Sequence, residues 1–146
     1  AEVIRRAHEA GVVRLVVTGS SLASSRRALA LAREHPGRVY ATAGVHPHHA
    51  HELAAADLPA LRELLAAPEV VAAGECGLDY FRNYSPRDAQ ERAFRAQLEL
   101  AIAAGRPLFL HQRDAHADFV RILRDYGRER PAAVAHCFTG AAHEAA

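Results

Sequence analysis

The sequence contains no methionine, no tryptophan and no lysine, and it has only two cysteines among 146 residues. Two cysteines cannot form the disulfide framework of a small secreted domain, which favours a reducing compartment. No run approaches the roughly 18 apolar residues of a membrane span, and the first residues do not form a signal-peptide pattern. We therefore expect a cytoplasmic protein with no membrane partner.

A charge imbalance is also lacking. The formal net charge is +1 and the pI is about 8.1, so the chain has no strong electrostatic footprint for nucleic acid. A nucleic-acid substrate would have to be held locally, by a metal ion and a few arginines. Half of the residues are hydrophobic, which is enough to build one domain with a core.

The two ends of the sequence have helical character. Residues 1–4 open inside a helix-like pattern without a methionine, and residues 141–146 resemble a helix that is just beginning. We therefore expect residues 1–146 to form a single partial domain that is truncated at both ends.

Helical and strand patterns alternate along the whole chain. Helices are predicted from amphipathic spacing and from Gly or Pro stops, and strands from short, mostly apolar runs. The predicted helices are 2–10, 24–34, 57–67, 86–105 and 116–126. The predicted strands are 12–18, 39–45, 70–74, 107–111 and 132–136. Repeated strand–helix units of this kind predict an α/β protein with a parallel sheet.

Polar residues decide between an open doubly wound sheet and a barrel. His46, Glu75, His111 and His136 each stand at the carboxyl end of a different predicted strand. A site assembled from many strand ends is typical of (β/α)₈ TIM barrels, whereas an open sheet gathers its ligand at one switch point. The sequence therefore predicts a fragment of a TIM barrel of the metallo-dependent hydrolase type, with about five βα units present.

Three of these residues have the chemistry of metal ligands. Glu75, His111 and His136 each end an apolar run, where a polar group is costly to bury without a partner. A divalent cation explains all three, because carboxylate oxygen and neutral imidazole are common protein ligands. Cys76 and Cys137 each follow a proposed ligand, and strand alternation turns them away from it, so both are predicted to be buried packing residues.

A histidine-rich segment follows the second predicted strand. His46, His48, His49 and His51 form either a metal-binding tract or a solvated loop, and His46 lies nearest the strand end. Asp79 follows Glu75 by four positions. It either orients a metal-bound water or a histidine, or it is an ordinary turn residue.

Arg113 follows His111 by two positions, so its side chain should point toward the same end of the barrel as that of His111. Its guanidinium is suited to gripping a phosphate with two hydrogen bonds. The alternative is an ion pair with Asp114 or Asp118.

Five segments also match known motifs in order along nearly the whole chain. They are Gly44-Val45-His46-Pro47-His48, Gly74-Glu75-Cys76-Gly77-Leu78-Asp79-Tyr80, the helix over 90–98, the stretch 111–116 and His136-Cys137-Phe138-Thr139-Gly140. Together they resemble the TatD family of deoxyribonucleases. Two family features are absent: the first strand, which often carries a His-x-His pair, and a late-strand aspartate that completes the metal site.

The resemblance implies a TIM barrel and a deoxyribonuclease that depends on Mg²⁺ or Mn²⁺, with Zn²⁺ as a further option. It implies a 3′→5′ exonuclease acting on single-stranded DNA, in repair or DNA breakdown, and a monomeric protein. By the same resemblance Glu75, His111 and His136 are metal ligands, and His46 and Arg113 lie near the substrate phosphate.

Two other functions fit the same residues. A metal-dependent amidohydrolase or lactonase would use similar ligands, but Arg113 favours a phosphate substrate, and the sequence offers no lysine at a strand end to bridge two metals. A non-catalytic remnant is the second alternative, against which the intact Glu75, His111 and His136 argue.

Overall fold

The computed structural model describes residues 2–136 and 138–145. Its strands are β1 Leu15–Val17, β2 Val39–Ala43, β3 Val70–Asp79, β4 Leu108–Arg113 and β5 Ala133–His136. Its α-helices are α1 Glu2–Glu9, α2 Leu22–Glu34, α3 Leu58–Ala66, α4 Arg87–Ala104 and α5 His116–Asp125. Within the described ranges, none of these helices combines the length and apolar character needed to cross a membrane.

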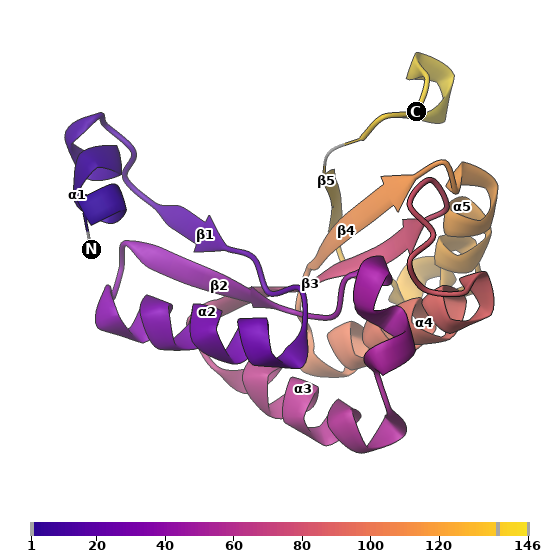
Figure 1. Cartoon of the computed structure of the whole chain (residues 1–146), viewed down its shortest axis with the longest axis horizontal. Coiled ribbons are helices and arrows are strands. Elements are labelled where there is room, and N and C mark those ends of the chain that lie inside the picture. The colour runs from indigo at the N-terminus through magenta and orange to yellow at the C-terminus, as the bar shows by residue number, and fades with distance from the viewer. Residues whose placement is uncertain (1, 137, 146) are drawn as a thin grey trace.

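The five strands form one parallel sheet in the order β1-β2-β3-β4-β5, and a helix connects each strand to the next. Figure 1 shows that the sheet curls like half of a barrel, with α2, α3 and α4 beneath one face of it. Among the residues that the structure describes, no helix covers the opposite, concave face in that view, and α1 stands apart from the sheet. The predicted α/β architecture of consecutive parallel βα units is confirmed.

The core lies between the convex face of the sheet and its helices. The largest fully buried apolar side chains include Leu61 and Leu65 of α3, Phe94 and Leu98 of α4, and Ile122 of α5. Spacings of three and four residues place them on the inner face of each helix, so burial of that face stabilises the layer.

The edge strand β1 is shorter than its apolar run predicts. Residues 12–18 were expected to form a strand buried on both faces, but the strand spans Leu15–Val17 and Val13 is 70% exposed. Among the described residues β1 pairs only with β2, so one side of its backbone has no neighbour to extend the pairing. Apolar composition alone does not bury a strand at the edge of a sheet.

The central strand β3 is longer than predicted, because it continues beyond Gly74 to Asp79. Glycines and polar residues make this segment resemble a loop, yet Gly77 and Leu78 pair with His111 and Gln112 of β4. Gly77 has a φ of 140°, and a Cβ there would lie 2.0 Å from the His111 carbonyl oxygen. The glycine therefore permits the close backbone approach that extends the strand.

Candidate metal centre

Three side chains converge at the carboxyl edge of the central strands. His46 follows β2, Glu75 lies in β3 and His111 lies in β4. One ligand atom from each lies within 4.8 Å of the others. Their side chains are 12%, 12% and 14% exposed, respectively, so the group is largely shielded but still reachable from solvent.

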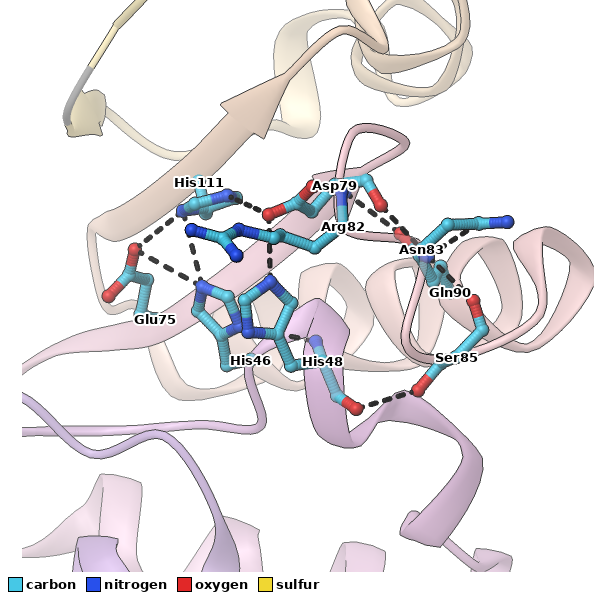
Figure 2. Close-up of polar contacts among 9 residues, drawn as sticks. All are labelled: His46, His48, Glu75, Asp79, Arg82, Asn83, Ser85, Gln90 and His111. Carbon is cyan, nitrogen blue, oxygen red and sulfur yellow. Dashed lines mark hydrogen bonds and ion pairs between the residues drawn. The ribbon is translucent and has the colours of Figure 1, made fainter.

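The ligand atoms of these three side chains lie close to one another. Nδ1 of His111 lies 3.0 Å from Oε1 of Glu75 and 3.2 Å from Nε2 of His46. The same Glu75 oxygen lies 3.7 Å from His46 Nε2 (Figure 2). One carboxylate oxygen and two imidazole nitrogens in this arrangement are a donor set that fits a divalent cation.

An irregularity in β3 aims Glu75 at this point. The register between β3 and β4 shifts between Gly74 and Cys76, so Glu75 has no partner residue in β4. Its backbone N–H instead donates to the carbonyl of Gly19, in the loop after β1, at 2.8 Å. The bulge re-aims the carboxylate, as bulges beside active sites commonly do.

The protonation states suit metal binding. Burial, followed by the charge of His111, lowers the pKa of His46 to about 4, so this imidazole is neutral at pH 7. Burial acts to raise the pKa of Glu75, but the hydrogen bond from His111 and the charges of the neighbouring histidines hold it below its ordinary value. Burial acts to lower the pKa of His111. The hydrogen bond to Glu75 and the charges of the nearby carboxylates outweigh burial, so this pKa is raised. A cation would compete with that proton for the His111 lone pair.

Asp79 links this group to a second histidine. It ends β3 with a side chain only 2% exposed, and its Oδ2 lies 2.8 Å from His48 Nε2 and 3.2 Å from His111 Nε2. Its Oδ1 accepts the backbone N–H of Arg82 at 2.8 Å. Asp79 thus holds the His111 ring from the side opposite Glu75 and also closes a turn, combining the two roles that the sequence left open.

The histidine-rich segment divides into two pairs. It forms the 3-10 helix η1 Pro47–Glu52, in which His48 packs edge-on against His46 with ring centroids 4.3 Å apart. His49 and His51 have other partners, because both approach Glu52 and Nδ1 of His51 lies 2.7 Å from the Ser85 hydroxyl. From the sequence, only His46 was favoured as a site residue. Pro47 begins a helical turn directly after His46, and this turn was the signal that His48 could return to the site.

Two buried glutamines of α4 hold the loops that carry the site. Gln97 accepts the N–H of Val45 at 2.7 Å and donates to its carbonyl at 3.0 Å. Gln90 accepts the N–H of Asp79 at 2.8 Å and donates to the carbonyl of Ser85 at 2.8 Å. Sequence reasoning missed both, although polar residues seven positions apart on a buried helix face were a signal.

His136 lies beside this group rather than within it. It is paired in register with His111, which puts both side chains on the same face of neighbouring strands. Its ring packs near that of Phe109, with centroids 4.8 Å apart, and the residue is exposed. The structure therefore brings Glu75 and His111 together with His46, and leaves His136 at the edge.

Arg113 lies over an aromatic ring. Its guanidinium carbon is 3.9 Å from the centroid of Phe81. In the described part of the chain no carboxylate pairs with Arg113, and Asp118 instead binds Arg121 and the hydroxyl of Tyr80. The expected alternative of an Arg113 ion pair with Asp114 or Asp118 is therefore not found among those residues.

Cys76 behaves as predicted. It is fully buried, and burial raises the pKa of its thiol to about 12. The same expectation for Cys137 lies outside the described residues.

A curled parallel sheet with carboxylate and imidazole groups at its carboxyl edge is typical of the βα-barrel class. The family described as TatD related DNase matches residues 1–146. The chain belongs to this family, as its motifs indicated.

Relatives of this chain include proteins named 3′-5′ ssDNA/RNA exonuclease TatD. That of Erwinia tasmaniensis is 50% identical over 139 residues, covering 95% of this chain and 54% of the relative. That of Edwardsiella piscicida is 51% identical over 146 residues, covering 98% and 55%. The chain thus spans about half the length of these relatives.

A solved structure of the same family has a similar fold. The crystal structure of YjjV, a TatD homolog from Escherichia coli K12, superposes with a TM-score of 0.86 at 32% identity, covering 97% of this chain and 55% of that one. The barrel architecture predicted from the strand-end residues is therefore confirmed.

Proposed function

We propose that the protein is a divalent-metal-dependent nuclease that hydrolyses DNA phosphodiester bonds, removing nucleotides 3′→5′ from single strands. The observation that carries the proposal is the convergence of ligand atoms from His46, Glu75 and His111 within 4.8 Å. The names of the relatives support a nucleic-acid substrate. The scarcity of cysteine supports a cytoplasmic location.

In this proposal Glu75, His111 and His136 hold the metal, and His46 offers a further nitrogen toward it. The in-register pairing of His111 with His136 supports the inclusion of His136 of β5 among the metal ligands. Mg²⁺ or Mn²⁺ is the expected ion and Zn²⁺ the alternative, because the donor set mixes oxygen and nitrogen. When bound, such an ion polarises a phosphoryl oxygen and acidifies water.

The chain's own residues orient these groups and bind the substrate. Asp79 fixes the ring of His111 and holds His48 beside it. Arg113 and Arg82, which have no carboxylate partner in the ranges that the structure describes, supply charge for the phosphate. Figure 2 shows the Arg82 side chain running across the histidine cluster in that view. These free guanidiniums favour a phosphodiester over the amide or lactone of the alternative reading.

The test is the cleavage of a 5′-fluorescein single-stranded oligonucleotide by the full-length protein. We expect a ladder shortened from the 3′ end with Mg²⁺ or Mn²⁺, no cleavage in EDTA, and slower cleavage of the matching duplex. Zn²⁺ is assayed in parallel. Absence of cleavage with every metal, together with turnover of an amide or lactone substrate, would replace the nuclease by the amidohydrolase reading.

A further inference from the structure

Two exposed aromatic rings stand beside the candidate metal centre. Phe81 is 55% exposed and Tyr84 is 62% exposed. Both lie in the loop between β3 and α4, directly after Asp79. The other large apolar side chains exposed in the described ranges are valines of α1, of β1 and the turn before it, and of β5. Apolar groups that are exposed together and rimmed by polar residues are typical of binding surfaces.

The site itself holds both rings in place. The ring of Tyr84 packs edge-on against His48, with centroids 4.8 Å apart at 66°. His48 is in turn bound by Asp79 at 2.8 Å. Phe81 lies under the guanidinium of Arg113, which follows His111 by two residues in β4. The rings are therefore tied to the site's own residues rather than to the hydrophobic core.

The loop that carries the rings is fixed at several points. Gln90 donates to the carbonyls of Asp79 and Ser85, and the Ser85 hydroxyl donates to the carbonyl of His48. The neighbouring Tyr80 shows the contrast, because its hydroxyl donates to Asp118 and its ring lies under Arg87. Tyr80 is thus half-buried and bound through its hydroxyl, whereas Phe81 and Tyr84 remain more than half exposed, although Arg113 lies over one face of Phe81.

Positive charge accompanies the rings. The guanidinium carbons of Arg113 and Arg82 lie 3.9 Å and 5.7 Å from the Phe81 centroid. A planar ring stacked with a cation matches a nucleotide, which presents a flat base and an anionic phosphate together.

We propose that Phe81 and Tyr84 form a base-stacking subsite that receives bases of the single strand whose end enters the metal centre. The inference rests on the proposed nuclease function, and it adds a reason why the protein would prefer single strands to duplexes. Stacking tolerates every base because each has a π face, whereas bases within a duplex are already stacked on their neighbours. The subsite therefore selects unpaired ends without selecting sequence.

The experiment compares two short oligodeoxyadenylates in the full-length protein, one intact and one with abasic sugars at its last two 3′ positions. We expect wild type to have a kcat/KM at least about tenfold higher for the intact strand, because stacking of even one base contributes a factor of about that size. In Phe81→Ala and Tyr84→Ala the ratio should fall toward unity. Tyr84→Phe and Phe81→Tyr, which keep a ring, should restore it. Val3→Ala, at an exposed apolar residue of α1, is the matched control and should keep the wild-type ratio.

Fluorescence anisotropy in EDTA gives the same ratio for binding alone, so the subsite is tested even if no strand is cleaved. A wild-type ratio near unity, or alanine variants that keep the wild-type ratio with a native circular dichroism spectrum, would overturn the subsite. Absence of cleavage by wild type with a normal binding ratio would instead overturn the proposed nuclease.

Discussion

The centre and the edges of the sheet differ sharply in packing. Most residues of β2 are buried, alternate residues of β4 are buried, and β3 is buried along its last four residues. All four residues of β5 are exposed, and Val16 of β1 is 54% exposed. Each central strand has hydrogen-bonded neighbours on both sides, while each edge strand has one within the described residues.

The comparison explains where the candidate site is best formed. Glu75 and His111 lie in the central strands β3 and β4, and His46 directly follows β2. Neighbouring strands and the glutamines of α4 fix these segments. His136 comes from the edge strand β5 and touches Phe109 rather than the cluster. Preorganisation of a site follows the packing of the elements beneath it.

The largest expected effect comes from the centre. In the full-length protein Glu75→Ala should reduce nuclease activity by several orders of magnitude, because the metal's Lewis-acid role is lost with its carboxylate ligand. Hydrolysis of a labelled oligonucleotide, with metal binding measured by calorimetry, checks this. Glu63→Ala, at an exposed carboxylate of α3, is the control and should behave as wild type. Wild-type activity in Glu75→Ala would remove Glu75 from the metal site.

The corresponding change at the edge is His136→Ala. Because we propose His136 as a metal ligand, its loss should also lower activity and metal affinity strongly. Equal losses for His136→Ala and Glu75→Ala would show that the edge strand shares the site with the centre. Unchanged metal affinity in His136→Ala would confine the centre to His46, Glu75 and His111.

A core change in β3 should have the next largest effect. Leu78 is fully buried, and Leu78→Ala should lower the free energy of unfolding by about 2–5 kcal/mol, because it removes buried apolar surface and leaves a cavity. Urea denaturation of the full-length protein measures this. A loss below about 1 kcal/mol would mean that the central strand is not the packed element described here.

Arg113→Ala should weaken DNA binding more than metal binding. Losing one charge-assisted contact to a phosphate costs about 1.5–3 kcal/mol, or roughly ten- to a hundredfold in the Michaelis constant. Steady-state kinetics and metal titration separate the two effects. Arg113→Lys keeps the charge without the planar fork and should recover only part of the loss. A collapse of metal affinity with an unchanged Michaelis constant would make Arg113 structural.

The smallest effect is expected at the edge. Val134 of β5 is 62% exposed, so Val134→Thr should change the free energy of unfolding by no more than about 0.5 kcal/mol. The urea method used for Leu78→Ala makes the two values comparable. A loss as large as that of Leu78→Ala would show that β5 is packed as tightly as the central strands and would remove the contrast between centre and edge.

The order of the βα units and the edge that carries the site could be predicted from the amino-acid sequence. Apolar runs of strand length separated by amphipathic helices permit a parallel sheet with short, right-handed connections, and parallel strands end at a common edge. That logic predicted that Glu75 and His111 would lie at one edge and that Cys76 would be buried, because strand order and alternation suffice for both predictions.

The remaining features depend on contacts between segments that are distant in the sequence. The extension of β3 to Asp79 depends on pairing with β4, and the choice of His48 over His49 depends on a carboxylate 31 residues away. Gln97 reaches Val45 across 52 residues, and Arg113 stacks on Phe81 instead of pairing with its neighbouring aspartates. Contacts between distant segments are set by how the helices pack on the curled sheet, and no periodicity within one segment encodes that packing.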